Sequence, residues 1–230
     1  MVLPFKPAFW PTLVALPAFL VLLALGTWQL DRLAWKTELN ATREAASTAP
    51  AVPLPQDLDE AKRVEFRRVA VGGVFAHDQE RYVGATSDGG QTGFHIMTPL
   101  RLPDGRTLLV NRGFVPSNLK DPARRAEGQL AGTQTVEGLV RIPPAGKPGW
   151  FAPENYPDAN MWFWVDTDRM APGSLPFYID AVAVPVPGGW PRGGTTRLRL
   201  PNDHLQYAIT WYSLAAALAV IYVVWHVKRP

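Results

Sequence analysis

Two uncharged stretches decide the fold of this 230-residue chain: PAFWPTLVALPAFLVLLALGTWQL at residues 7–30 and LQYAITWYSLAAALAVIYVVW at residues 205–225. Neither stretch contains Asp, Glu, Lys or Arg. Since an α-helix rises about 1.5 Å per residue, each stretch is long enough to cross a hydrocarbon core of roughly 30 Å. The sequence therefore predicts two transmembrane helices, one near each end of the chain.

Aromatic residues mark both ends of each predicted span. Trp10 and Trp28 are 18 residues apart, and so are Tyr207 and Trp225. This spacing corresponds to about 27 Å of helix, and Trp and Tyr concentrate where a bilayer meets water. The aromatic spacing thus supports two spans of similar length.

The distribution of charge predicts the orientation of the chain in the membrane. All 20 acidic residues lie between Asp31 and Asp203, together with 20 of the 23 Lys and Arg residues, so the net charge of +3 comes from Lys6, Lys228 and Arg229 in the tails. Short positive tails stay on the cytoplasmic side, whereas long loops are largely exempt from this rule. We expect both termini in the cytoplasm. Because the excess charge lies in the tails, the basic pI gives no indication of nucleic-acid binding.

The first apolar stretch is expected to remain as an uncleaved anchor, because it is long for a signal peptide and lacks a small-x-small cleavage site. No Arg- and Ser-rich transit peptide precedes it, which favours a bacterial inner membrane over an organelle. The predicted organisation is a cytoplasmic tail at residues 1–8, a span at 9–30 in a helix that extends to about residue 45, a periplasmic β-rich domain at 31–203, a second span at 204–226 and a cytoplasmic tail at 227–230.

The middle of the chain is predicted to form a β-barrel-like domain with short helices. Pro103-Asp104-Gly105 between two apolar runs predicts a hairpin, and closing the sheet into a barrel removes its exposed edges. Asp57 and Asp121 are candidate N-caps of short helices. Gly188-Gly189 and Gly193-Gly194 are expected in a flexible turn. The eight expected strands are residues 66–75, 81–85, 93–102, 106–115, 134–142, 161–166, 177–185 and 195–200.

Several classes of function are excluded or disfavoured by residues that the chain lacks. It contains no cysteine, which excludes a disulfide scaffold, a thiolate metal site and covalent haem attachment through C-x-x-C-H. It also lacks the G-x-S-x-G, H-E-x-x-H and G-x-x-x-x-G-K-S/T motifs of hydrolases, zinc proteases and nucleotide-binding enzymes. We therefore expect that the protein is not an enzyme.

A series of motifs follows between residues 25 and 212: LGTWQLDRLAWK at 25–36, RVAVGGVF at 68–75, GFHIMTPL at 93–100, LVNRGFVP at 109–116, PEN at 153–155 with WF at 162–163, PGG at 187–189 and NDHLQYAITWY at 202–212. In this order they resemble the surfeit locus protein 1 family of cytochrome c oxidase assembly factors. The resemblance implies binding of haem a and its delivery to the catalytic, haem-bearing subunit of the oxidase, with haem a synthase as a further partner. A stable accessory subunit that binds no haem shares every one of these features and is the alternative.

His204 is the candidate iron ligand, because it lies at the outer end of the second predicted span and haem iron accepts imidazole. Tyr207 and Trp211 follow at i+3 and i+7 and share its helical face. The resemblance also implies a ligand at the position of His204. His, Tyr and Trp anchor helix ends at the bilayer surface without any ligand, and this alternative stays open.

Trp28, Gln29 and Arg32 lie at the outer end of the first span and are further candidates for contact with haem. A guanidinium binds carboxylates through two hydrogen bonds, so Arg32 is able to pair with a haem propionate. Extension of Arg32 toward the membrane surface is the simpler alternative. Histidines other than His204 are expected to be structural: His77 in a solvated turn, His95 within a strand and His226 at the inner end of the second span.

Four residues are candidates for contact with a protein partner. Trp35 shares a helical face with Trp28, and Arg112 follows an apolar strand where it is able to meet a partner carboxylate. An ordinary surface arginine is the simpler interpretation of Arg112. Trp162 and Phe163 are adjacent, so a strand places them on opposite faces, and at least one face is expected to contact a partner.

Overall fold

The computed structural model describes residues 7–228, which form two compact units. The helical unit takes the chain up to residue 42 together with the chain from residue 198 onward, and the barrel unit is residues 43–197. Lys6 and Arg229, two of the three tail charges, lie outside the described residues.

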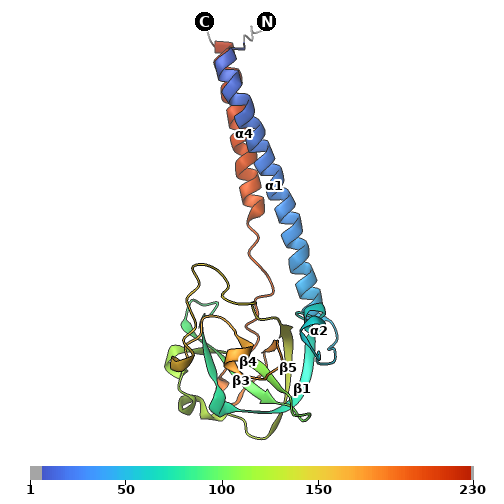
Figure 1. The fold of residues 1–230 in the computed structure, drawn as a ribbon. Coiled ribbons are helices and arrows are strands. Elements are labelled where there is room, and N and C mark those ends of the chain that lie inside the picture. The colour runs from blue at the N-terminus through green and yellow to red at the C-terminus, as the bar shows by residue number, and fades with distance from the viewer. Residues whose placement is uncertain (1–6, 229–230) are drawn as a thin grey trace. The chain divides into compact units, whose positions relative to one another are not determined.

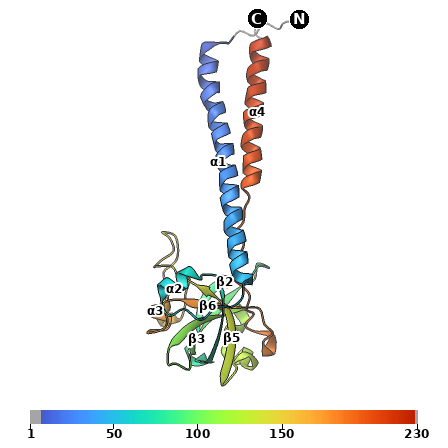
Figure 2. The ribbon, with the colours of Figure 1, turned by 90° about the vertical axis from the view of Figure 1, so that its right-hand side faces the viewer.

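The helical unit consists of two long helices that lie side by side, α1 (Phe9–Thr48, of which residues 9–42 belong to this unit) and α4 (His204–Lys228) (Figures 1 and 2). Their most apolar windows have mean hydropathies of 2.1 and 1.8, and only 6% and 11% of these windows are buried inside the protein. A core helix of a soluble protein is mostly buried, so these helices have the length, composition and exposure of membrane spans. The helix α1 continues past the predicted span of residues 9–30 and reaches Thr48.

Small and hydroxyl-bearing side chains bring α1 and α4 together. A Cβ atom at Gly26 would lie 2.8 Å from the ring of Tyr212, and the hydroxyl of Tyr212 is 3.0 Å from the Oγ1 of Thr27. Near the other end of the pair, the hydroxyls of Thr12 and Tyr222 are 2.5 Å apart. Close backbone approach and interhelical hydrogen bonds are the means by which membrane helices associate. The two helices are therefore antiparallel and in direct contact.

The segment before α4 is bonded to α1. The side-chain amide of Asn40 donates to the carbonyl of Leu200 at 3.0 Å, and its oxygen accepts the Leu200 N–H at 2.9 Å. The Asn202 amide donates to the Oγ1 of Thr37 at 3.1 Å. These contacts determine the register at which α4 begins.

The barrel unit is built on one six-stranded sheet in the order β1-β5-β6-β4-β3-β2, and β1 also pairs with β3. This extra pairing closes a ring of five strands, with β2 attached to the outside of β3. All pairs are antiparallel except β4 with β6. The predicted barrel is confirmed. The strands are β1 (Arg68–Phe75), β2 (Arg81–Thr86), β3 (Thr92–Arg101), β4 (Thr107–Pro116), β5 (Thr133–Arg141) and β6 (Tyr178–Ala181).

Short helices connect the strands, and both predicted N-caps are present. The Asp57 carboxylate accepts the Glu60 N–H at 2.8 Å, and the Asp121 carboxylate accepts the Ala123 N–H at 2.9 Å. The helices of the barrel unit are α2 (Leu58–Arg63), η1 (His77–Gln79), η2 (Ser117–Leu119), η3 (Pro122–Gly128), η4 (Pro157–Ala159), α3 (Thr167–Met170) and η5 (Pro187–Gly189).

Two of the eight expected strands are wrong, residues 161–166 and 195–200. In the first, pairing is limited to two isolated bridges: Met161 exchanges backbone hydrogen bonds with Tyr156, and Trp162 exchanges them with Tyr82 and Gly84. The chain then turns into α3, because the Asp166 carboxylate accepts the Arg169 N–H at 3.1 Å. Residues 195–197 of the second segment belong to an extended stretch, residues 190–197, which we call the strap.

Two separate hydrophobic clusters cover the two faces of the sheet. Successive residues of a strand point to opposite faces, and the clusters divide accordingly. Val110 and Ile179 lie in the cluster inside the barrel, whereas their neighbours Leu109 and Tyr178 lie in the outer cluster with Trp162. The outer cluster is covered by the segments that follow β5.

The glycines of the strap serve close backbone packing. Phe114 and Arg192 exchange backbone hydrogen bonds of 2.8 and 3.0 Å. A Cβ atom at Gly113, whose φ is +116°, would lie 1.9 Å from the Arg192 carbonyl oxygen. At Gly193 it would lie 2.4 Å from the Val182 carbonyl oxygen. Only glycine allows the strap to pass this close to β4 and to the end of β6.

Candidate functional site

The first residue of α4, His204, meets a side chain of α1. Its Nδ1 lies 2.6 Å from the Oε1 of Gln29, and Gln29 is only 8% exposed. An amide oxygen accepts hydrogen bonds and does not donate them, so Nδ1 of His204 carries the proton. In the neutral imidazole the other nitrogen, Nε2, then has a free lone pair. Within residues 7–228 no side chain or backbone group is bonded to Nε2.

This arrangement is typical of an imidazole that is prepared to bind a metal. Metal-binding histidines almost always donate their second N–H to an oxygen, which fixes the tautomer and the ring orientation. The sequence placed Gln29 at the end of the first span, and the structure shows that it contacts His204 directly. Their separation of 175 residues explains why the sequence does not reveal this pair.

The cation of the candidate site lies over an aromatic ring. The guanidinium of Arg32 is 4.4 Å from the centre of the Trp35 ring, one helical turn along α1. Arg32 forms no ion pair with any of the described residues. Trp28, one turn earlier on α1, is also exposed. Arg32 is therefore free to bind an anion, and extension of its side chain toward the membrane surface remains the alternative.

The two aromatic candidate residues of α4 differ in how far they are exposed. Trp211 is half-buried, whereas Tyr207 is 55% exposed. Ala208, which lies between them in the chain, is buried. The indole N–H of Trp211 is buried and has no hydrogen-bond partner among the described residues. His204, Ala208 and Trp211 therefore lie on one face of α4, and Tyr207 lies on its flank.

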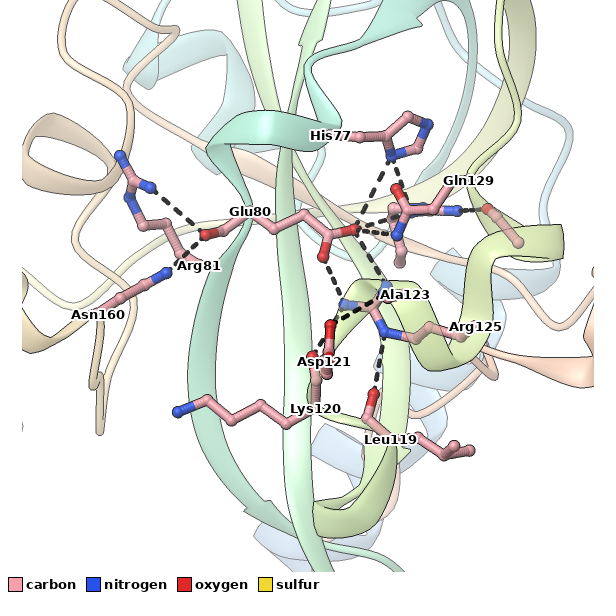
Figure 3. Close-up of polar contacts among 12 residues, drawn as sticks. His77, Glu80, Arg81, Leu119, Lys120, Asp121, Ala123, Arg125, Gln129 and Asn160 are labelled. Atoms are coloured by element: carbon pink, nitrogen blue, oxygen red, sulfur yellow. Dashed lines mark hydrogen bonds and ion pairs between the residues drawn. The ribbon is translucent and has the colours of Figure 1, made fainter.

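The barrel unit contains a second polar cluster, which the sequence analysis missed. Figure 3 shows Glu80 at its centre, where the carboxylate accepts hydrogen bonds from Arg125 at 2.5 and 3.2 Å and from Gln129 at 3.1 Å. Arg112 donates to the same carboxylate at 3.2 Å. Glu80 is 3% exposed, so this cluster lies in the interior. We call these four residues and His77 the Glu80 cluster.

The Glu80 cluster corrects two expectations. Arg112 was expected on the surface, but it is buried, donates to the Gly128 carbonyl and lies over the ring of Phe75. Burial lowers the pKa of Arg112, and Glu80 acts in the opposite direction. His77 was expected in a solvated turn, but its ring contacts Arg112 at 3.2 Å and the Leu130 carbonyl at 3.0 Å. Neither side chain is presented to a partner.

Trp162 and Phe163 point in opposite directions, as predicted. Trp162 is 1% exposed and its indole N–H donates to the Asn160 side chain at 3.0 Å. Phe163 is 40% exposed and packs edge-to-face with Tyr156, at 6.4 Å between ring centres. Of this pair, only Phe163 offers a surface to a partner.

Known proteins resemble this chain along most of its length. Residues 16–216 match the SURF1 family. A SURF1-like protein of Monosiga brevicollis is 41% identical over 229 residues, which cover 94% of this chain and 86% of that protein. Surfeit locus protein 1 of Homo sapiens is 42% identical over 86% of this chain and 71% of its own length. Surfeit locus protein 1 of Takifugu rubripes is 38% identical over 89% of this chain and 92% of its own length.

Proposed function

The chain belongs to the SURF1 family, a family of cytochrome c oxidase assembly proteins, and on this premise we propose that it binds haem a at His204. The bound haem is then cargo, which the protein delivers to the haem-bearing catalytic subunit of the oxidase. We expect it to act as an assembly factor rather than as an enzyme, because the sequence lacks the enzyme motifs named above.

The observation that carries this proposal is the hydrogen bond between His204 and Gln29, because it leaves Nε2 of His204 as a free electron-pair donor. The described residues contain no group of three His, Asp or Glu side chains able to hold a bare metal ion. A porphyrin brings four nitrogen ligands of its own, so a single protein imidazole suffices as the axial ligand. The residues present therefore fit a haem better than a free metal ion.

The neighbouring side chains supply the remaining contacts that a haem needs. Arg32 is available to pair with a propionate, because its guanidinium forms no ion pair with the described residues. The rings of Trp28, Tyr207 and Trp211 provide aromatic surfaces against which a flat macrocycle packs. An oxygen acceptor on the bound group would also satisfy the unpaired indole N–H of Trp211.

Two exposed aromatic residues are the remaining candidates for contact with the partner. Trp35 of the helical unit is 49% exposed, and Phe163 of the barrel unit is 40% exposed. Large exposed apolar side chains are typical of protein interfaces, where aromatic residues contribute most of the binding energy. We assign to both a role in docking to the oxidase subunit or to haem a synthase.

The proposed location is a bacterial inner membrane, with both termini in the cytoplasm and the barrel unit in the periplasm. The relatives named above come from eukaryotes, and the orientation rests on the three tail cations. An alkaline phosphatase fused at residue 130 should be active, and one fused after residue 229 should be inactive. The reverse pattern would overturn the orientation.

Substitution of the ligand tests the haem proposal directly. His204→Ala removes the imidazole but keeps the helix, because alanine is the best helix former. We expect normal membrane insertion and a loss of most bound haem, measured from the absorption spectrum of protein purified from cells that make haem a. Gln206→Ala on the exposed side of α4 is the matched control and should retain its haem. Normal haem occupancy in His204→Ala would refute the ligand assignment.

The alternative, a stable accessory subunit, is tested by stoichiometry. An assembly factor leaves after maturation, so the purified mature oxidase should contain it in far less than equimolar amount. An accessory subunit would be present at one copy per oxidase, and His204→Ala would then leave the haem content of the oxidase unchanged.

A further inference from the structure

The barrel unit contains a large cavity on the face of the sheet that is opposite the barrel interior. Its volume is about 720 Å³, which lies in the range of cavities that bind small organic molecules. Residues of β3, β4 and β6 form its floor, and the strap and the loop between β2 and β3 form its walls. We call this the outer cavity. Every residue that lines it belongs to the barrel unit.

One wall of the outer cavity is aromatic. Phe114 lies between His95, at 6.3 Å between ring centres, and Trp190, at 6.5 Å. The guanidinium of Arg192 lies 4.1 Å from the centre of the Trp190 ring. Rings at these distances offer edges and faces to a flat unsaturated molecule.

The floor of the cavity holds a hydrogen-bond donor that the protein itself does not use. The hydroxyl of Tyr178 makes no hydrogen bond to any of the described residues, although Tyr178 is only 8% exposed. Burial raises the pKa of Tyr178, so its hydroxyl keeps its proton and is a donor at neutral pH. Burial also lowers the pKa of His95, so its ring is neutral at pH 7. The Tyr178 hydroxyl is open to the cavity, so a ligand bound there can reach it.

The charges that line the cavity leave a positive excess. Asp180 is fully used by the protein, because its carboxylate accepts from Asn111 at 2.8 Å, Arg141 at 3.0 Å and Thr196 at 2.8 Å. Arg192 forms no ion pair with the described residues. Arg197 is 3.7 Å from Asp88, but both side chains are largely exposed and such a pair is weak. The cations available to a ligand are therefore Arg192 and Arg197.

We propose that the outer cavity is a binding site for a small organic carboxylate whose body is a flat unsaturated ring system. The carboxylate is bound by the hydroxyl of Tyr178 and by Arg192, and the ring packs against Phe114 and Trp190. A guanidinium fork matches the two oxygens of a carboxylate, which makes this pairing specific. This site is distinct from the one at His204 and does not depend on it.

A site for an extended peptide that joins the sheet as a further strand fits this region less well than a site for a small carboxylate. The outer edge of β2 borders the cavity, but Tyr82 and Gly84 already exchange backbone hydrogen bonds with Trp162. Strand addition needs a free backbone edge. The unused groups at the cavity belong to side chains, so they recognise a compact ligand.

The test uses 6-fluoro-2-naphthoate as a probe, because it combines a flat ring with one carboxylate. Binding to the full chain in lipid nanodiscs is followed by broadening of the fluorine resonance, and empty nanodiscs measure partition into lipid. We expect saturable binding of one probe per chain. Tyr178→Phe and Arg192→Gln should each weaken binding about tenfold, since each removes one hydrogen bond to a charged group.

Control variants separate this site from folding defects and from the haem proposal. Tyr178→Phe keeps the ring and loses a hydroxyl without a partner, so its thermal unfolding midpoint should equal that of the wild type. Arg124→Gln, which lies outside the cavity and bonds to the Asn118 carbonyl, should bind the probe normally. His204→Ala should also bind it normally, whatever its haem content.

The neutral analogue 6-fluoro-2-naphthalenemethanol tests the requirement for charge and should bind at least about tenfold more weakly than the carboxylate. Equal binding of the two probes would overturn the proposal. So would unchanged affinity in both Tyr178→Phe and Arg192→Gln, or broadening no greater than that with empty nanodiscs.

Discussion

The Glu80 cluster of the barrel unit and the His204–Gln29 pair of the helical unit are both polar contacts between distant parts of the chain, but they differ in what they leave unused. Glu80 receives donors from Arg112, Arg125 and Gln129, so its carboxylate is saturated by the protein. His204 is held through one nitrogen only, and Nε2 has no partner among the described residues.

This difference separates a structural from a functional use of polar side chains. A buried group whose bonding capacity is filled by the protein stabilises one conformation. A group that is oriented by the protein and keeps a free donor or acceptor is available to a ligand. By this criterion Arg112, which the sequence suggested as a partner contact, belongs to the fold, and His204 fits the binding site that we propose. Four experiments test this separation, from the largest expected effect to the smallest.

Glu80→Gln should have the largest effect on stability. The substitution keeps the size of the side chain but leaves the buried guanidiniums of Arg112 and Arg125 without a counter-charge. Removing one partner of a buried ion pair costs about 3–5 kcal/mol in the free energy of unfolding. Denaturant unfolding of the full chain in detergent measures this loss. Glu154→Gln breaks the exposed pair with Lys147 and should cost at most about 1 kcal/mol. Equal losses of unfolding free energy in Glu80→Gln and Glu154→Gln would contradict the distinction between the buried cluster and the exposed pair.

Trp162→Ala and Phe163→Ala apply the same criterion to two adjacent residues. Trp162 is buried in the outer hydrophobic cluster, so its loss should cost about 3–5 kcal/mol of unfolding free energy. Phe163 is half-exposed, and its loss should cost about 1 kcal/mol. If Phe163 contacts the partner, Phe163→Ala should instead reduce co-purification of the oxidase subunit. Normal co-purification would remove Phe163 from the interface.

Gln29→Leu should weaken haem binding without a comparable loss of stability. The leucine removes the acceptor that orients His204, and loss of such an outer contact typically lowers metal affinity by about 10–100-fold. Haem titration of the purified protein, followed by absorbance, measures the affinity. The same substitution at Gln206, an exposed position of α4, is the control and should leave the affinity unchanged. An unchanged affinity in Gln29→Leu would show that the hydrogen bond to His204 is only structural.

His95→Gln should have the smallest effect, visible only in the pH dependence of stability. Burial lowers the pKa of His95 in the folded state below the value of about 6.5 expected for the unfolded chain. The unfolded chain therefore takes up this proton first as the pH falls. The contribution of the neutral His95 ring to the free energy of unfolding is fully present above about pH 6.5. It is lost as the pH falls toward the lower pKa of the folded state. Unfolding free energies measured between pH 8 and pH 5 should decline less in His95→Gln. Parallel curves would contradict this assignment.

Local signals in the sequence predicted the main elements correctly. The uncharged stretches predicted both long helices, because the length and composition of a span are properties of consecutive residues. Asp57 and Asp121 were recognised as N-caps for the same reason, since a cap bonds to residues two or three positions along the chain. The expected strands at 161–166 and 195–200 were wrong because a strand needs a partner, and local composition does not supply one.

By itself, the sequence determined that the chain has two apolar helices around a β-rich domain, that it resembles one family, and that His204 is its candidate ligand. Only the tertiary structure decided which of these side chains meet. Gln29 meets His204 across 175 residues, Glu80 meets Arg125 across 45, and the strap passes over Gly113. Helical and strand periodicities extend over a few residues, whereas hydrogen bonds between distant residues depend on how the whole chain packs, so no local pattern encodes them.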